Sequence, residues 1–271
     1  MGDIPPLPGA GDRWALFLDV DGTLVAIAPT PETVRADPTL LALLERLRGA
    51  CGGALALISG RSLASIDRVF RPLTLPAAGV HGWERRRADG AAMPINVSTE
   101  ALLPLRQVLE TYAATHPGLL FEDKGDSVAL HYRLAPRYGA AVCRLARGLA
   151  AQHPELRLIE GRKVVEFVPR GTDKGRAVSA FVAEPPFAGR YPVYVGDDAT
   201  DEDAFIAVNQ LGGSSVKVDD PEQRVRSTAA QFRLPSVSAM HDWLAAVAAR
   251  LEGDHAAEPT GGTATARAAF S

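Results

Sequence analysis

The stretch Trp14-Ala-Leu-Phe-Leu-Asp19-Val-Asp21-Gly-Thr-Leu24 combines a short apolar run with two aspartates and a glycine that ends it. The run is typical of a strand buried on both faces, and Asp21-Gly22 is a turn signal. Because side chains alternate along a strand, Asp19 and Asp21 place two carboxylates on the same side of one strand end. Like charges at this spacing are costly unless they share a cation or a proton, and Mg²⁺ prefers such oxygen ligands. An Asp-Gly turn that caps a helix is the alternative interpretation.

Two further apolar runs of strand length also end in polar turns. Ala54-Leu-Ala-Leu-Ile58 is followed by Ser59-Gly60, and Tyr191-Pro-Val-Tyr-Val195 is followed by Gly196-Asp197-Asp198. Between the first two runs, residues 40–47 have helical apolar spacing. Strands buried on both faces and separated by helices predict an α/β fold with a doubly wound parallel sheet. Since ligands bind outside the carboxyl ends of such strands, we expect these polar turns to form one site.

The second acidic cluster is Asp197-Asp198-Ala-Thr-Asp201-Glu-Asp203. Acids suit a helix N-terminus because they complement the helix dipole, and Thr200 with Asp203 resembles a capping box. That interpretation leaves Asp197, directly after a buried strand, unexplained. Beside the carboxylates of Asp19 and Asp21, a metal role for Asp197 is the interpretation that we favour.

Two other segments offer groups that bind phosphate. Ser59-Gly60-Arg61 supplies a hydroxyl and backbone N–H donors at the start of a helix, where anions bind readily. Lys174 follows the turn Gly171-Thr-Asp and begins a helical pattern, which allows its ammonium to reach a phosphate. For an isolated lysine, a solvated surface position is the alternative.

A smaller unit interrupts the alternation of buried strands and helices. Asp126-Ser-Val-Ala-Leu-His-Tyr-Arg133 and Lys163-Val-Val-Glu-Phe-Val168 alternate like half-exposed strands, and residues 138–151 between them have helical spacing. A helical pattern with a proline at position 104 covers residues 98–112. These patterns predict a small α+β cap domain with one open sheet face.

The predicted organisation places this cap domain inside the chain of a hydrolase core. The core comprises residues 13–97 and 170–251, and the cap comprises residues 98–169. Residues 1–12 form an N-terminal tail, and residues 252–271, which carry few large apolar side chains, form a disordered C-terminal tail.

Composition limits the classes of partner. The 271 residues are 46% hydrophobic and 23% charged, which is typical of globular proteins, and the net charge of −3 gives no electrostatic reason to expect nucleic acid. The chain has no apolar run long enough for a bilayer and no apolar leader, so we expect a cytoplasmic protein without membrane contact. The two cysteines, Cys51 and Cys143, are expected to be free thiols. We expect a monomer.

Two acids, a hydroxyl, a lysine and further acids, in this order, resemble the four motifs of the haloacid dehalogenase superfamily. The resemblance implies that Asp19 attacks phosphorus and becomes an aspartyl phosphate. It implies that Asp21 protonates the leaving oxygen and then activates water, while Ser59 and Lys174 hold the phosphoryl oxygens. Mg²⁺ would be bound by Asp19, Asp197 and the backbone carbonyl of Asp21.

Four other segments carry a closer resemblance. Phe121-Glu-Asp-Lys-Gly125, Leu130-His-Tyr-Arg133, Gly161-Arg-Lys-Val-Val-Glu166 and Val80-His-Gly-Trp-Glu84 are similar to segments of the trehalose-6-phosphate phosphatase family. The resemblance implies hydrolysis of trehalose 6-phosphate to trehalose and phosphate. It also implies six substrate-binding side chains: Arg61, His81, Glu122, Lys124, Arg133 and Glu166.

Three alternatives remain at this point. Each of the charged cap residues can instead form a surface salt bridge. The enzyme can act on another sugar phosphate, such as sucrose phosphate. A catalytically inactive sensor of trehalose 6-phosphate is the least favoured alternative, because both Asp19 and Asp21 are present.

Overall fold

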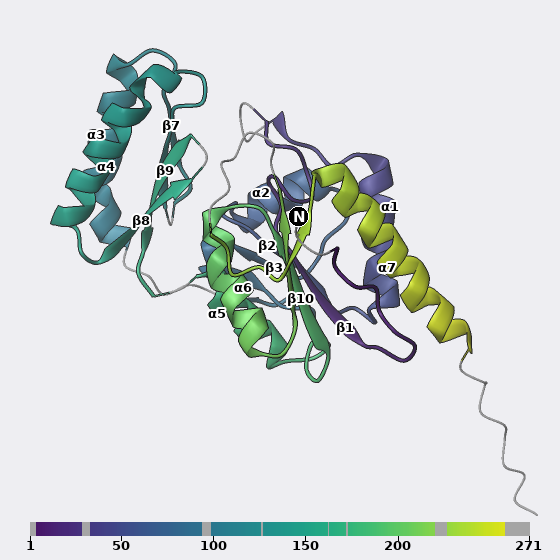
Figure 1. Ribbon diagram of the computed structural model, residues 1–271. Helices are drawn as coiled ribbons and strands as arrows, with labels where there is room; N and C mark the ends of the chain where they lie inside the picture. Colours follow the sequence, from purple (N-terminus) through teal and green to yellow (C-terminus); the bar gives the residue numbers. More distant parts are fainter. Residues whose placement is uncertain are drawn as a thin grey trace, which may run out of the picture.

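The structure is a computed structural model that describes residues 4–28, 33–93, 99–125, 127–161, 163–171, 173–219 and 227–257. These residues form two bodies, a larger one built on an eight-stranded sheet and a smaller one built on a four-stranded sheet (Figure 1). The predicted fold class, an α/β core with a parallel sheet and a smaller α+β unit, is confirmed.

The large sheet has the strand order β12-β11-β10-β1-β2-β3-β4-β5. Strands from β12 to β3 run parallel, and β4 and β5 add an antiparallel edge. Their bounds are β1 (Trp14–Leu18), β2 (Leu55–Ile58), β3 (Ala77–Gly79), β4 (Glu84–Arg86), β5 (Ala92–Met93), β10 (Tyr191–Gly196), β11 (Ser214–Val218) and β12 (Phe232–Leu234). The central strand β1 has β2 on one side and β10 on the other, so the strand order reverses there and creates a ligand-binding crevice.

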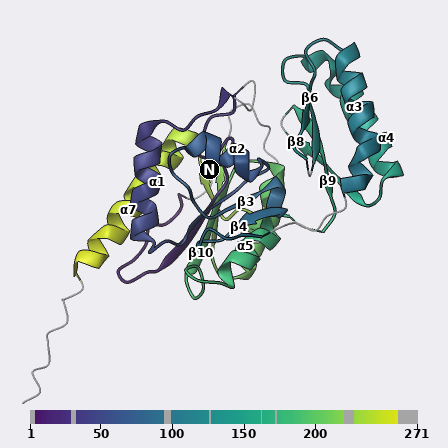
Figure 2. The same cartoon turned by 180° about the vertical axis from the view of Figure 1, so that it is seen from behind.

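Helices cover both faces of this sheet. Helix α1 (Pro38–Ala50) packs against α7 (Val237–Ala257) on one face, and α5 (Lys174–Val182) packs against α6 (Glu202–Gln210) on the other (Figures 1 and 2). Helix α2 (Leu63–Phe70) follows β2. All five residues of β1 are buried, as expected of a strand covered on both faces.

The cap owes its shape to alternating side chains. Its sheet has the order β6-β7-β9-β8, with strands β6 (Leu120–Asp123), β7 (Val128–His131), β8 (Leu156–Gly161) and β9 (Val164–Pro169). Val128, Leu130, Val165 and Phe167 lie in one hydrophobic cluster with Leu109 of helix α3 (Leu103–Thr115) and Val142 of α4 (Gly139–Gln152). The residues between them point to the opposite face.

Details of three predicted elements differ from the structure. The pattern at 98–112 contains a 3₁₀ turn, η3 (Thr99–Leu102), and the α-helix begins only at Leu103, because Pro104 fits the first helical turn but not a helix interior. Helix α7 continues beyond Leu251 to Ala257, so a disordered tail beginning at residue 252 was placed too early. Residues 1–3 and 258–271 of the expected tails lie outside the described residues.

The remaining expectations concern the thiols and the membrane. Cys51 and Cys143 are free, with Cys51 buried and Cys143 half-buried. Among the described residues, no helix is both long enough and apolar enough to cross a membrane.

Because the cap has a hydrophobic cluster of its own, truncating Leu109 destabilises it. Leu109 is fully buried, and we expect Leu109→Ala to cost about 2–5 kcal/mol of unfolding free energy in denaturant titrations. The neighbouring Val108 on the same helix is 40% exposed, and Val108→Ala, the matched control, should change stability by less than about 0.5 kcal/mol. Equal effects of the two substitutions would contradict this description of the cap.

Candidate active site

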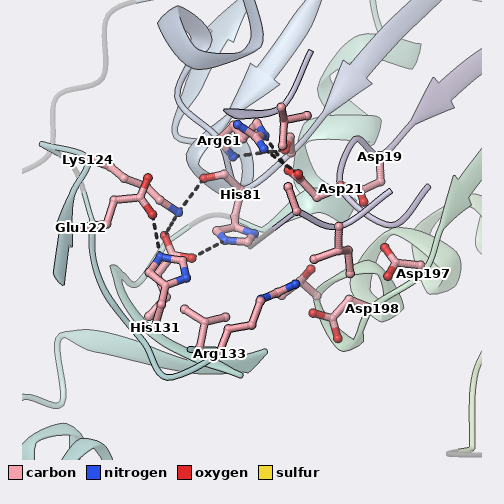
Figure 3. Close-up of a pocket in the computed structure, with 18 of the residues that line it drawn as sticks. Asp19, Asp21, Arg61, His81, Glu122, Lys124, His131, Arg133, Asp197 and Asp198 are labelled. Atoms are coloured by element: carbon pink, nitrogen blue, oxygen red, sulfur yellow. Dashed lines mark hydrogen bonds and ion pairs between the residues drawn. The ribbon is translucent and has the colours of Figure 1, made fainter. Parts of the chain in front are cut away.

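One cavity lies between the carboxyl ends of the core strands and the polar face of the cap sheet (Figure 3). Its walls include all eleven side chains that the sequence predicts for the site: Asp19, Asp21, Ser59, Arg61, His81, Glu122, Lys124, Arg133, Glu166, Lys174 and Asp197. The structure therefore brings the four distant motifs and the cap segments together. It leaves their individual chemical roles to be tested.

Lys174 is the cation at the base of the core side of the cavity. It is the first residue of α5, which Asp173 caps by accepting a hydrogen bond from the Arg176 backbone N–H. Lys174 is 2% exposed, and its ammonium donates to Asp19 Oδ1 at 2.7 Å and to Asp201 Oδ1 at 2.6 Å. Burial alone would lower the pKa of Lys174, but the two carboxylates outweigh burial and raise it. The lysine is therefore charged at neutral pH.

Asp201 anchors this arrangement, and the sequence predicted it only as one member of an acidic cluster. Its Oδ1 accepts hydrogen bonds from Lys174 and, at 2.5 Å, from the Tyr194 hydroxyl. Its Oδ2 accepts from the backbone N–H groups of Asp197 at 3.0 Å and Asp198 at 2.9 Å. Four donors fill the acceptor capacity of a carboxylate. Asp201 therefore fixes Lys174 and the loop that carries Asp197.

Three acids could hold a metal ion here. Ligand oxygens of Asp19, Asp197 and Asp201 all lie within 4.8 Å of one another, and all three side chains are buried. Since Asp201 already accepts four hydrogen bonds, Asp19 and Asp197 are the better-placed ligands. The Asp21 carboxylate is not in this group. Asp21 could therefore bind the metal through its backbone carbonyl, as the resemblance implies.

The charge balance of the site favours a divalent cation. Burial raises the pKa of Asp19 to about 7, with Lys174 acting against burial and Asp201 adding to it. Burial, reinforced by Asp19 and Asp201, also raises the pKa of Asp197. Among the described residues, Lys174 supplies the one ammonium that contacts these three carboxylates, and its single charge does not neutralise them. A divalent cation among hard oxygen ligands removes that deficit.

Asp21 is held by Arg61 rather than left free. The guanidinium donates from Nε to Asp21 Oδ2 and from Nη2 to Asp21 Oδ1, both at 2.6 Å, in a bidentate pair. Its Nη1 donates to Ser65 Oγ at 3.2 Å. Arg61 thus orients the predicted acid and base in this state, and its expected contact with the phosphate or the sugar stays a prediction.

Ser59 and Gly60 bring the end of β2 close to His81. The buried Ser59 hydroxyl accepts from the Arg61 backbone N–H at 3.2 Å. A side-chain carbon added to Gly60 would lie 2.7 Å from His81 Nε2, so only glycine allows this approach. His81 itself has positive backbone dihedrals, φ 55° and ψ 31°. Its Nδ1 is buried without a hydrogen-bond partner among the described residues.

Glu166 links the cap to the core. Its Oε1 accepts from Lys124 Nζ at 2.8 Å and from Ser127 Oγ at 2.7 Å, and its Oε2 lies 3.3 Å from His81 Nε2. Lys124 also donates to the Gly60 carbonyl at 3.1 Å. Glu166 and Lys124, both predicted to bind sugar hydroxyls, are thus paired with each other within the cap, and their contacts with His81 and the Gly60 carbonyl cross the domain boundary. The pair is largely shielded, with side-chain exposures of 13% for Lys124 and 8% for Glu166, so the surface salt bridge considered from the sequence does not describe it.

Burial and charge act in opposite directions on these groups. Burial alone would raise the pKa of Glu166, but the Lys124 ammonium and His81 outweigh it, so the pKa is lowered. Burial lowers the pKa of His81 more than Glu166 raises it, and the imidazole is neutral at neutral pH. The cap therefore presents one ion pair to the core, and the core meets it with the neutral ring of His81.

In addition to the role of Asp201, sequence reasoning missed three further residues of the site. His131 lies 2.8 Å from Glu122 across two cap strands. Lys217 of β11 is buried and donates its ammonium to the backbone carbonyl of Asp197. Tyr194 of β10 is fully buried and donates to Asp201. The alternation of β7, which places His131 on the side of Ala129, was the available signal for His131; Lys217 and Tyr194 gave none.

The lowered pKa of Glu166 predicts a specific sensitivity to acid. A carboxylate whose pKa is lowered by folding stabilises the protein above its unfolded value of 4.5, and this contribution is lost as the pH falls below it. Between about pH 5 and pH 3, the unfolding free energy of the wild type should fall more steeply than that of Glu166→Gln, by up to about 1.4 kcal/mol per pH unit. Denaturant titrations at several pH values measure both slopes, and parallel slopes would contradict the pairing.

Comparison with known proteins identifies the family to which the chain is similar. The family model described as trehalose-phosphatase matches residues 17–238. The chain is 41% identical over 245 residues to trehalose-6-phosphate phosphatase of Escherichia coli (strain K12), covering 90% of each protein. It is 43% identical over 238 residues to a probable trehalose-phosphate phosphatase of Sinorhizobium fredii, covering 88% of each.

Solved structures show the same fold. The C-terminal domain of Candida albicans trehalose-6-phosphate phosphatase superposes with a TM-score of 0.79 at 20% identity, covering 88% of this chain and 93% of that one. A Bacteroides thetaiotaomicron phosphatase of the haloalkanoate (HAD) enzyme superfamily superposes with a TM-score of 0.58 at 16% identity, covering 90% and 95%. The family model and the two sequence relatives, which span nearly the whole described chain, establish that this protein belongs to the trehalose-phosphatase family.

Proposed function

We propose that the protein hydrolyses trehalose 6-phosphate to trehalose and inorganic phosphate, with Mg²⁺ and an aspartyl-phosphate intermediate at Asp19. The observation that carries the proposal is the Asp19–Lys174–Asp201 cluster, which lies under a polar cap in a chain of the trehalose-phosphatase family. Hydrolysis of a phosphate monoester is so slow in water that enzymes accelerate it by up to ~10²¹. Positioning and charge neutralisation supply most of such an acceleration.

Asp19 is the proposed nucleophile because one of its oxygens is fixed and the other is available. Lys174 binds Oδ1 at 2.7 Å, which leaves Oδ2 to attack phosphorus. Attack forms the Asp19 O–P bond and breaks the bond from phosphorus to the sugar oxygen. A bound Mg²⁺, held by Asp19, Asp197 and the Asp21 carbonyl, would keep the Asp19 carboxylate ionised and offset the charge of the phosphoryl oxygens.

Asp21 is the proposed proton carrier. It gives its proton to the leaving sugar oxygen, and the resulting carboxylate takes a proton from the water that hydrolyses the aspartyl phosphate. The two steps leave Asp21 protonated again, so the cycle balances. In this state the Arg61 guanidinium donates to both oxygens of Asp21 and favours the ionised carboxylate, so the proposed role requires Arg61 to release at least one oxygen when the substrate binds. Ser59 and Lys174 are the proposed donors to the phosphoryl oxygens.

The cap, which we assign to residues 98–169, is the proposed sugar-binding lid of a core made of residues 13–97 and 170–251. Its sheet and the residues just beyond the strand ends present Glu122, Lys124, Glu166 and Arg133 to the cavity, and His81 meets them from the core. Carboxylates accept hydrogen bonds from hydroxyls and ammonium groups donate them, which matches a disaccharide. A lid also excludes water from the phosphoryl-transfer step. The cytoplasmic location and the monomeric state stay predictions.

A substrate panel tests the proposed function. We expect trehalose 6-phosphate to be hydrolysed with at least about tenfold higher kcat/KM than sucrose 6-phosphate or glucose 6-phosphate, because the cap groups would lose partners with either. Phosphate release should require Mg²⁺ and stop in EDTA. If sucrose phosphate were the better substrate, the alternative sugar phosphatase would replace this proposal. Absence of phosphate release with every ester would favour the sensor.

Asp19→Asn tests the nucleophile. The amide cannot form the acyl phosphate, so we expect turnover of trehalose 6-phosphate to fall by at least about 10³-fold, while the melting temperature is maintained or raised because a buried charge is removed. Asp198→Asn is the matched control: Asp198 borders the same cavity but is not one of the three acids, Asp19, Asp197 and Asp201, whose ligand oxygens lie close together, and the variant should retain most of the activity. Substantial turnover by Asp19→Asn would overturn the assignment.

A further inference from the structure

The polar face of the cap sheet carries two carboxylates at matched positions. In the strand register, Glu122 of β6 and Glu166 of β9 both lie opposite Ala129 of β7. The small methyl group of Ala129 separates them on the face that lines the cavity. His131 lies two residues beyond Ala129 on the same strand and therefore on the same face. The row thus brings two acids and one imidazole to the cap side of the cavity, where Figure 3 shows Glu122 and His131.

The two carboxylates differ in how their hydrogen-bonding capacity is used. Glu166 has contacts on both oxygens, with Lys124 and Ser127 on Oε1 and His81 on Oε2. Among the described residues, Glu122 has one hydrogen-bond partner, His131, whose Nε2 lies 2.8 Å from Glu122 Oε2. Glu122 Oε1 therefore keeps its full capacity to accept a hydrogen bond from a ligand.

The His131–Glu122 pair lies diagonally across two antiparallel strands. Glu122 pairs with Ala129 and His131 pairs with Leu120, so the two long side chains meet over the gap left by Ala129. Both are largely shielded, with side-chain exposures of 16% for His131 and 22% for Glu122. A glutamate has three rotatable bonds, and a single donor at a fixed backbone position restricts them.

The electrostatics of Glu122 agree with this geometry. Burial alone would raise its pKa, but the hydrogen bond from His131 and the charge of Lys124 outweigh burial and lower it. The carboxylate is ionised at neutral pH, and an ionised acceptor forms stronger hydrogen bonds with hydroxyl donors than a neutral one.

We propose that His131 is a positioning residue for substrate recognition: it binds Glu122 Oε2 and so aims Glu122 Oε1 at a hydroxyl of the sugar leaving group. This inference rests on the proposed function, because it requires a hydroxyl-rich leaving group under the cap. His131 acts through Glu122 rather than on the phosphate, since the predicted nucleophile and the lysine that holds it belong to the core. A leaving group without hydroxyls gains nothing from the pair.

The inference predicts a change in substrate preference rather than a general loss. We compare kcat/KM for trehalose 6-phosphate with kcat/KM for a small aryl phosphate in His131→Leu. The ratio of the two values should fall at least about tenfold, as expected when a buried carboxylate loses the donor that orients it. His131→Gln, which keeps an N–H donor, should restore most of the ratio. The effect should appear mainly in KM for trehalose 6-phosphate.

A double-mutant cycle tests whether His131 acts through Glu122. Glu122→Gln alone should lower the ratio, and adding His131→Leu to it should change the ratio by less than about twofold, because the residue to be oriented is already altered. The matched control is His153→Leu, which removes a second His–Glu pair of the cap, 3.2 Å from Glu155 and outside the cavity. It should leave the ratio unchanged.

The outcomes separate this inference from the proposed function. If the wild type shows no preference for trehalose 6-phosphate, the proposed function fails. If the wild type shows the preference and His131→Leu keeps it, or if the two substitutions act additively, the positioning role is overturned. Should His131→Leu fail to fold, His131→Asn, which shortens the donor, replaces it in the cycle with the same expected fall in the ratio.

Discussion

The rest of this structure depends on one buried ammonium group. Lys174 lies between Asp19 and Asp201, and its charge holds together the carboxyl ends of β1 and β10. In the sequence, Lys174 is 155 residues from Asp19 and 27 residues from Asp201. The arrangement is short of positive charge, because Asp197 adds a third buried carboxylate. Removing charges from water is costly unless they are paired. This deficit favours a divalent cation, and the charge of that cation would in turn offset the charge of an anionic phosphoryl group.

The cap completes the site by a different principle. Its sheet uses strict alternation, so that one face packs against α3 and α4 while the other carries ionisable groups over the core. Glu166 and Lys124 of the cap connect the two domains through polar contacts with His81 and with the Gly60 carbonyl of the core. Such contacts add little net free energy to the stability of the protein, but they fix the geometry of the domain boundary when every partner is present. In the proposed function, the side chains that bind the sugar are therefore the same ones that connect the cap to the core.

The sequence predicts the strand ends well and the contacts between them poorly. Asp19, Ser59 and Asp197 each follow an apolar run, so their presence in one cavity could be predicted from the rule that strand ends converge. The anchoring role of Asp201 depends on a loop that folds back on its own carboxylate. The contact of Lys217 with Asp197 requires β11 to lie beside β10, an order that the chain alone does not reveal. Short strands such as β6, in which apolar and polar residues do not alternate, lack the period of two by which β7 was predicted.

The central claim is that the group formed by Asp19, Asp197 and Asp201 binds one divalent cation. Calorimetric titration of the metal-free protein with Mg²⁺ tests this claim most directly. The account predicts one equivalent per chain, with binding lost or weakened by at least about tenfold in Asp197→Asn and kept in Asp203→Asn, whose carboxylate pairs with Arg157 at 3.0 Å instead. Failure of the folded wild type to bind Mg²⁺, or equal binding by both variants, would contradict the account.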